Sequence, residues 1–268
     1  MIVNFDEFLD KLLQFLLHEV YEKLIHFLVI FFNRIYLGLV DLFWHIFNRK
    51  YFCKAKKSKE NDLEILHQSC NFLIINKLHD TLLNSNDKSK NSTVSSKLKK
   101  NFPDLLVDYQ DFFFANRLDF ATSGILLVPL NRKSITEVWD NFEQQKYSKF
   151  YYLALVRGHV ENEYEIIDNM IGEDTRYLTT SKKMCTSREK VHCKNARRST
   201  TKFLVLEKGF YNNKPVTKIL LLPMTPIRRH QLRIHCLEIG NPIVGDYTYL
   251  SSLKSDIRPP RMFLHAFR

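Results

Sequence analysis

The chain carries NRLDFATSG at residues 116–124, a stretch that places the carboxylate of Asp119 two residues after the guanidinium of Arg117. An apolar run with β propensity, Phe112–Ala115, lies upstream, and Ile125–Leu130 downstream has the length of a buried strand. A carboxylate at the mouth of a strand is well placed for chemistry, and an aspartate can act as nucleophile toward a glycosidic carbon. Asp119 is therefore our candidate nucleophile. The alternative is that Asp119 and the Thr-Ser-Gly turn after it only cap a loop.

A second stretch has the start and stop signals of a helix. Thr225 is a suitable N-cap, Pro226 suits the first helical position, and Gly240 suits the end. In such a helix Arg229 and Arg233 are four residues apart and share one face. Because a helix N-terminus already favours anions, we expect the pair to bind a carboxylate or a phosphate. The alternative is two exposed arginines without a ligand.

Apolar periodicity and turn signals predict the remaining elements. We expect a strand over 150–156, on which Tyr151 and Tyr152 point to opposite faces. Ser134 and Glu137 indicate a capping box at the start of a helix that runs to about Gln145. The other expected segments are a hairpin from Leu63 to Ile75, a mobile surface loop over Asn84–Asn101, and strands over Thr201–Glu207 and Thr217–Leu222 joined by a longer turn. This mixture predicts an α+β domain over residues 61–268.

The charge of the chain predicts a polyanionic partner. A formal net charge of +11 and a pI near 9.3 favour either nucleic acid or an anionic membrane surface. Basic residues are dense from Arg176 to Lys202, where no apolar period is sustained, so we expect a loop that binds phosphates. The members that we single out are Lys182, Lys183, Arg197 and Arg198. The alternative is a solvated charged loop.

The cysteines argue against a metal site and a disulfide scaffold. The five of them form no Cys-x-x-Cys pair and have no zinc-ligand spacing. An odd number also suits a reducing compartment. We therefore expect an intracellular protein, with the cytoplasm as the simplest location, and neither a metal nor a small-molecule cofactor. Membrane association or an organelle stays open.

The first 60 residues differ in composition from the rest. Phe5–Phe47 is dense in large apolar residues and predicts an apolar helical N-terminal extension, which a polybasic linker of Lys and Arg between Arg49 and Lys59 follows. Acidic residues argue against a mitochondrial transit peptide, and the missing basic start argues against a secretory signal. Three interpretations stay open: a helical pair packed on the body or on a partner, a membrane-attached segment, or a mis-assigned start of the coding sequence.

Three ordered motifs resemble those of the RluA-like RNA pseudouridine synthases. NRLDFATSGILLV is similar to the family signature HRLDxxTSGxxL, and YYLALVRG, Tyr151–Gly158, resembles the second motif. RRHQLRIHCLEIGNPIVGDYTY, Arg228–Tyr249, resembles the third, RTHQLRVHxxxxGxPIxGDxxY. The resemblance runs from about Leu63 to the last residue.

This resemblance implies a fold and a reaction. The fold is the pseudouridine synthase fold, with a mixed, largely antiparallel sheet and flanking helices. The reaction is the cofactor-independent isomerisation of uridine to pseudouridine in RNA by an RNA-binding enzyme, which we expect to be a monomer. Asp119 matches the family's catalytic aspartate, and Arg233 matches the arginine that pairs with it. Tyr152 matches the tyrosine that stacks on the flipped base, although counting from Lys149 selects Tyr151 instead. Arg117, Arg228 and Arg229 are the further candidates for RNA binding.

The chain departs from the family pattern at several positions. Asn116 stands where the family mostly has His, Pro226-Ile227 replaces Thr-Gly, and Leu250 replaces a Gly. Family members continue past Leu264–Ala266 into a further strand, so we expect the domain to be truncated at its C-terminal end. Two other functions stay open. The truncated end makes a catalytically silent RNA-binding protein of the same fold plausible, and the other is a membrane-tethered interaction protein whose N-terminal helices are the functional part.

Overall fold

The computed structural model describes residues 63–85, 92–106, 111–143, 150–179, 183–188, 191–250 and 259–267, all within one compact unit, Asp62–Arg268. The predicted extension and linker, residues 1–60, lie outside the described residues. The predicted domain boundaries therefore stay predictions. No helix within the described ranges has the length and the apolar content needed to cross a membrane.

Strands make up most of the described chain. They are β1 (Glu64–Gln68), β2 (Phe72–Lys77), β3 (Ser123–Pro129), β4 (Tyr152–Arg157), β5 (Tyr164–Asp168), β6 (Ile171–Asp174), β7 (Met184–Thr186), β8 (Cys193–Arg197), β9 (Thr200–Tyr211), β10 (Lys214–Pro223) and β11 (Leu264–Ala266). The helices are α2 (Val94–Asn101), α3 (Arg132–Glu143), α4 (Gln231–Glu238) and α5 (Tyr247–Leu250), with 3₁₀ turns η1 (Pro103–Leu106) and η2 (Thr175–Tyr177).

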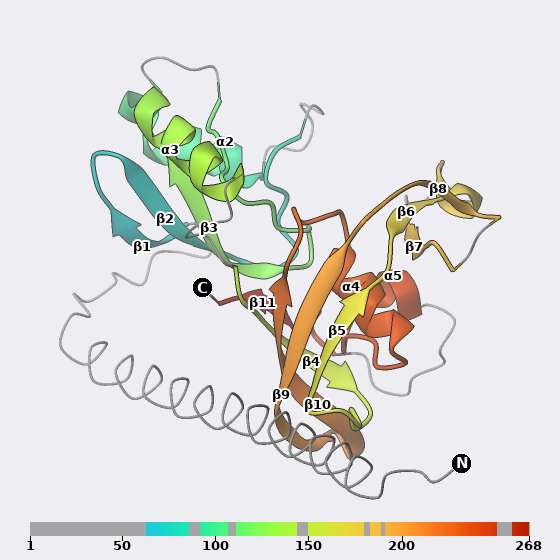
Figure 1. Ribbon diagram of the computed structural model, residues 1–268. Helices are drawn as coiled ribbons and strands as arrows, with labels where there is room; N and C mark the ends of the chain where they lie inside the picture. The colour runs from blue at the N-terminus through green and yellow to red at the C-terminus, as the bar shows by residue number, and fades with distance from the viewer. Residues whose placement is uncertain are drawn as a thin grey trace, which may run out of the picture. The chain divides into compact units, whose positions relative to one another are not determined.

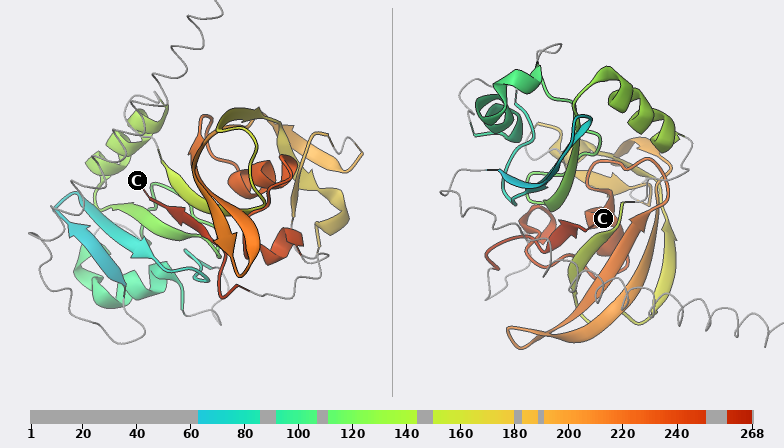
Figure 2. Two further views of the ribbon diagram at one scale, coloured as in Figure 1. Left: turned by 90° about the horizontal axis from the view of Figure 1, so that it is seen from below. Right: turned by 90° about the vertical axis from the view of Figure 1, so that its left-hand side faces the viewer.

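Eight strands form one sheet in the order β1-β2-β3-β11-β4-β10-β9-β5 (Figure 1). Neighbours in this sheet are antiparallel except β3 and β11, which are parallel. A second sheet has the order β7-β6-β8. Figure 2 shows α2 and α3 beside the β1–β3 part of the large sheet, and α4 and α5 beside the β4–β5 part. The predicted α+β fold with a mixed, largely antiparallel sheet and flanking helices is confirmed.

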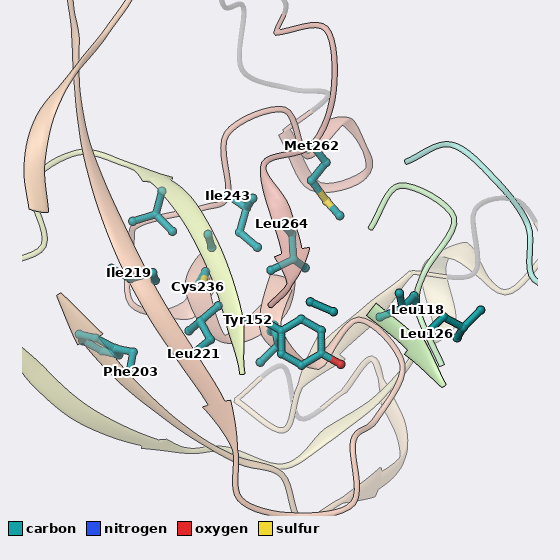
Figure 3. Packing of buried hydrophobic residues seen from close by; sticks show 14 of the residues in the cluster. Leu118, Leu126, Tyr152, Phe203, Ile219, Leu221, Cys236, Ile243, Met262 and Leu264 are labelled. Carbon is teal, nitrogen blue, oxygen red and sulfur yellow. The ribbon is translucent and has the colours of Figure 1, made fainter. Parts of the chain in front are cut away.

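The core lies between the large sheet and the helices α2 and α4. Alternate residues of β4 are buried, as expected for a strand with one face on a core. Tyr152 from this face packs in one cluster with Leu221 of β10 and Leu264 of β11, and α4 adds Leu232 and Cys236 (Figure 3). Burial of one such large apolar side chain stabilises the fold by about 1.5–3 kcal/mol. Tyr152, the candidate active-site tyrosine, is thus also a residue of the hydrophobic core.

The surface loop predicted over Asn84–Asn101 is wrong for its last eight residues, where α2 forms. Thr93 and Ser96 cap this helix reciprocally, since each side chain accepts from the backbone amide of the other. Val94 and Leu98 are fully buried in the core. The backbone amides of Val94 and Ser95 also donate to the carbonyls of Leu82 and Leu83, 2.8 Å each, so the start of the helix is attached to the body by hydrogen bonds as well as by apolar contacts.

The capping box of α3 lies one turn earlier than predicted. Asn131 Oδ1 accepts from the amide of Ser134 (2.9 Å), and Ser134 Oγ accepts from the amide of Asn131 (3.2 Å). The helix therefore begins at Arg132, and Glu137 is not part of the box. The helix itself and the strand before it, β3, are confirmed.

The predicted hairpins are confirmed, with one change in a turn. The first hairpin is β1–β2 and the second is β9–β10. The longer turn predicted for the second is wrong, because only Asn212 and Asn213 separate its strands. Both have positive φ, 49° and 60°, which matches the two-residue turns of tight hairpins and which asparagine tolerates.

The basic loop predicted over Arg176–Lys202 is wrong as a loop. Its described residues form the end of η2, β7, β8 and the start of β9. The strand β6 pairs with β7 and with β8, and Ile171, Cys185 and Thr186 are buried, although the sequence shows no sustained apolar period. The basic residues are therefore spread over a folded element.

Candidate active site

One side chain fixes the loop that carries Asp119. Asn116 Nδ2 donates to the carbonyl of Ile125 (2.9 Å), and its Oδ1 accepts from the amide of Leu127 (2.9 Å). The amide thus makes the two bonds to β3 that a neighbouring strand would make. The run Phe112–Ala115, in spite of its predicted β propensity, is not a strand in the structure.

A close backbone contact fixes the other end of this loop. Gly124 has φ +119°, and a Cβ there would lie 2.2 Å from the carbonyl oxygen of Ala266 in β11. Only glycine fits this conformation and this distance. The amide of Thr122 donates to the carbonyl of Asp119 (3.1 Å), which closes a turn. The Asp119 side chain, 26% exposed, lines a cleft at the end of β3.

A buried lysine lies beneath the same turn. Lys77, only 1% exposed, donates from Nζ to the carbonyls of Leu78 (2.9 Å) and Phe120 (3.1 Å). Burial lowers the pKa of Lys77 to about 8, against the attraction of Asp119, which raises it. Lys77 therefore ties the peptide after Asp119 to the end of β2.

Arg233 brings a fixed positive charge to Asp119. Its Nη1 lies 3.4 Å from Asp119 Oδ2, while Nε and Nη2 donate to Asp246 Oδ2 (2.7 Å) and Oδ1 (2.6 Å). Both partners of the fork are buried, with side chains 5% and 2% exposed. Burial lowers the pKa of Arg233, but the hydrogen bonds and charge of Asp246 outweigh this effect and raise it. The predicted pairing of Arg233 with Asp119 is present, and the planar fork belongs to Asp246.

A histidine and a tyrosine complete this side of the cleft. His230 Nδ1 lies 2.7 Å from the Tyr249 hydroxyl, and His230 Nε2 lies 3.9 Å from Asp119 Oδ2. The ring of Tyr249 also lies under the Arg233 guanidinium, with 5.1 Å from Cζ to the ring centroid. Burial, then the charges of Arg233 and Arg229, lower the pKa of His230 to about 3. The imidazole is therefore neutral at physiological pH.

Tyr152 forms the apolar wall opposite. It is 3% exposed, lies on the buried face of β4 and lines the cleft, whereas its neighbour Tyr151 is half-buried and not among the lining residues. Burial, then the charge of Asp119, raise the pKa of Tyr152 well above its ordinary value. Tyr152 is therefore a neutral phenol at the site.

The cleft has a volume of about 1300 Å³ and brings together most of the predicted site residues. Those that line it are Asp119, Arg233, Tyr152, Arg117, Arg228, Arg229 and Lys183. Arg197 and Arg198 are not among its lining residues: Arg197 lies on β8, and Arg198 pairs with Asp168 on the surface (3.3 Å). Lys182 lies outside the described residues. Among the described residues, no three His, Cys, Asp or Glu side chains gather in a metal-binding arrangement.

The helix predicted from Thr225 is wrong at its start. α4 begins at Gln231, and Thr225 Oγ1 instead accepts from the amide of Thr200 (3.1 Å). Arg229 thus precedes the helix and is exposed, so it does not share a helix face with Arg233. The end of the helix before Gly240, which has φ +79°, is confirmed.

Sequence reasoning missed four residues of this site: Lys77, His230, Asp246 and Tyr249. A signal existed for Lys77, because the alternation of FLIINK places residue 77 on the same face as the buried Leu73 and Ile75. The other three lie within the third motif, where spacing alone does not indicate which polar residues touch one another.

Comparisons with known proteins agree with this geometry. A model of the family RNA pseudouridylate synthase matches residues 71–238. RNA pseudouridylate synthase domain-containing protein 1 of Danio rerio is 44% identical over 212 residues, which cover 78% of this chain and 70% of that protein. The Dual-specificity RNA pseudouridine synthase RluA of Haemophilus influenzae is 36% identical over 152 residues, 57% of this chain and 63% of that protein.

A solved structure gives the same result for the fold. The structure of Human RNA Pseudouridylate Synthase Domain Containing 1 superposes with a TM-score of 0.65 and 36% identity, and the match covers 78% of each chain. The resemblance of the three motifs to the RluA-like enzymes is thereby confirmed. The family model matches well over half of this sequence, and the chain belongs to the RNA pseudouridylate synthase family.

Proposed function

We propose that this chain is an RNA pseudouridine synthase, which isomerises uridine to pseudouridine in RNA with Asp119 as its nucleophile. The observation that carries the proposal is the meeting of three side chains at one cleft. Asp119, Arg233 and Tyr152 come from three distant parts of the sequence, and all three line it. Family membership supports the same reaction.

The reaction needs one bond broken and one formed at the same carbon. A carboxylate oxygen of Asp119 attacks C1′ of the uridine, and the C1′–N1 bond breaks, with its electron pair on the uracil. The uracil turns, its C5 bonds to C1′, and the carboxylate leaves. The proton on C5 is then lost and N1 is protonated, so the product is an isomer of the substrate. Arg233, 3.4 Å from Asp119, favours the anionic carboxylate that the first step requires.

The uridine has to leave its stack to reach Asp119. Unstacking costs a few kcal/mol, which contacts in the pocket and with the phosphates must offset. Tyr152 contributes the face of a neutral ring within an apolar wall, and base stacking on an aromatic side chain contributes about 1–3 kcal/mol. Tyr152 is accordingly the stacking residue of the proposal.

Basic side chains at the mouth of the cleft supply the phosphate contacts. Arg117 and Arg229 are exposed and line the mouth, and Lys183 lies 4.4 Å above the ring of Tyr177, which also lines it. The Nε of Arg228 is buried and has no hydrogen-bond partner among the described residues, so it is available to an anionic ligand. These four cations are the RNA-binding set of the proposal.

Three properties rest on the sequence alone and stay predictions. They are a monomeric state, an intracellular location, and membrane attachment through residues 1–60.

The proposal is tested by Asp119→Asn. This change is nearly isosteric, so we expect unchanged folding and RNA affinity but no pseudouridine, because an amide does not replace the attacking carboxylate. The assay is pseudouridine yield on uridine-containing cellular RNA beside a binding measurement on the same RNA. Asp140→Asn, at an exposed position of α3, is the matched control and should keep full activity. If wild type and Asp119→Asn bind alike and neither forms pseudouridine, the chain is an RNA-binding protein and not a synthase.

A further inference from the structure

His230 has an unusual backbone conformation just before α4. Its φ of 56° lies in the left-handed region, which is strained for a residue other than glycine. His230 is the N-cap residue of α4, yet its side chain makes no capping hydrogen bond. The conformation instead turns the ring, whose side chain is 9% exposed, toward the cleft and Asp119. Strain without a capping role points to a functional reason for this residue.

The hydrogen bond with Tyr249 favours one of the two neutral tautomers of His230. The Tyr249 hydroxyl oxygen accepts from the backbone amide of Met184 (3.0 Å), so its own hydrogen can be donated to His230 Nδ1 (2.7 Å). A neutral imidazole that accepts at Nδ1 carries its proton at Nε2. In this tautomer the nitrogen that faces the Asp119 carboxylate, an acceptor, is an N–H donor without a positive charge.

The two groups that approach Asp119 approach the same oxygen. Arg233 Nη1 lies 3.4 Å from Oδ2, and His230 Nε2 lies 3.9 Å from it. No hydrogen bond from another described residue reaches Oδ1. Hydrogen bonds of catalytic groups are often long before substrate binds and shorten in the complex. Oδ1 is thus the oxygen left for the substrate.

We propose that His230 is a positioning residue for the reaction, and that its neutral Nε2–H, together with Arg233, holds Oδ2 of Asp119 so that Oδ1 faces C1′ of the uridine. Tyr249 acts through His230 by fixing this tautomer. A protonated imidazole would form a second ion pair with the carboxylate and make it a weaker nucleophile, whereas a neutral donor orients the carboxylate at a smaller cost. This role rests on the proposed function of Asp119.

Tyr249 also gives this arrangement a connection to the RNA-binding side of the cleft. The backbone amide of Met184 donates a hydrogen bond to the Tyr249 hydroxyl. Met184 directly follows Lys183, which lines the cleft. A shift of β7 when RNA binds would therefore move the hydroxyl that orients His230.

Two substitutions of His230 separate orientation from folding. Asparagine tolerates the left-handed conformation but ends near the position of Nδ1, so His230→Asn removes the donor that faces Asp119. The side-chain amide of glutamine in His230→Gln carries a neutral N–H that reaches about as far as Nε2 of the histidine. We expect His230→Asn to lower the single-turnover rate of pseudouridine formation by about 10- to 100-fold, as for a reacting group displaced by about 1 Å, with RNA affinity changed less than about twofold. His230→Gln should recover most of the rate.

Tyr249→Phe tests whether the hydroxyl acts through the histidine. The ring under Arg233 is kept and only the hydroxyl is lost, so we expect a smaller decrease in rate than in His230→Asn. The double variant His230→Asn/Tyr249→Phe should be no slower than His230→Asn alone, because the hydroxyl then has nothing to orient. Additive losses would mean that Tyr249 acts independently, and would overturn this part of the proposal. His67→Asn, on the exposed β1, is the matched control for the substitution itself.

Nitrogen NMR of the histidine rings in the full chain measures the tautomer without any assay of activity. His230 should be protonated at Nε2 in wild type and should lose this preference in Tyr249→Phe. A wild-type rate in His230→Asn, or an Nδ1-protonated His230 in wild type, would overturn the proposal. Failure of the proposed function looks different, because wild type itself would then form no pseudouridine.

Discussion

The pair Arg233–Asp246 should determine stability as well as activity, and Asp246→Asn isolates its charge. The structure gives two charge-assisted hydrogen bonds, of 2.7 and 2.6 Å, between side chains that are 5% and 2% exposed. Removal of one charge from a buried pair typically costs about 3–5 kcal/mol, because the other charge stays buried without compensation. Asparagine keeps one acceptor oxygen, so we expect the lower end, about 3 kcal/mol. For a unit of this size that corresponds to a melting temperature lower by about 6–12 °C.

The assay is thermal and urea unfolding of the full chain, followed by circular dichroism, with pseudouridine yield measured alongside. Asp168→Asn is the matched control, because Asp168 also pairs with an arginine, Arg198, but at 3.3 Å and with both side chains largely exposed. An exposed pair of this kind contributes little to stability, because solvent and salt screen its charges. The double variant Arg233→Met/Asp246→Asn removes both charges, so it should be less destabilised than the sum of its single changes. Equal stability losses in Asp246→Asn and Asp168→Asn would refute the reasoning.

Three further predictions follow from the site and its surroundings. The pKa of Lys77 is about 8 in the folded chain and 10.5 in the unfolded chain, so between these pH values the unfolded chain binds more protons and the free energy of unfolding should rise with pH. The rise should be roughly 3 kcal/mol in wild type and absent in Lys77→Met, as measured by urea unfolding at pH 8 and 10.5. Lys183→Ala should reduce the slope of log binding constant against log salt concentration for RNA binding by about 0.7–0.9. Arg198→Ala should change this slope little, because Arg198 is already paired with Asp168. Equal slopes in the two variants would remove Lys183 from the RNA-binding set. A chain that starts at Asp62 should stay soluble and keep its RNA affinity in filter binding, and aggregation of it alone would show that residues 1–61 belong to the core.

Short-range signals in the sequence identified most of the sheet. A continuous apolar run indicated β3. Apolar periodicity and turn signals indicated β2, β4 and the hairpin β9–β10, because a strand with one buried face has to alternate. The errors fall where a few contacts outweigh composition. α2 forms in a polar stretch because Val94 and Leu98 reach the core, and the start of α4 moved because the side chain of Thr225 found a partner in β9. Neither partner is visible within a local window.

The candidate catalytic residues could be predicted from the sequence, whereas the residues that hold them in place could not. Asp119, Arg233 and Tyr152 were identified from motifs, and the structure places all three at one cleft. Asp246 and Tyr249 act on Arg233 and His230 only because α5 packs beside α4, a long-range arrangement that the spacing of residues does not contain. The basic residues divide similarly: Lys183 lines the cleft, whereas Arg197, at the end of β8, and Arg198, which pairs with Asp168, do not.

The departure at Asn116 shows why the site tolerates change around Asp119. The family mostly has His at this position, and the structure gives Asn116 a purely positional task, since its amide donates to Ile125 and accepts from Leu127. A primary amide has the donor and the acceptor side by side, as a peptide group has, so it fits the edge of β3 directly. A neutral imidazole can also donate with one nitrogen and accept with the other. The exchange of one for the other therefore changes how the loop is held and leaves untouched the carboxylate that the loop presents.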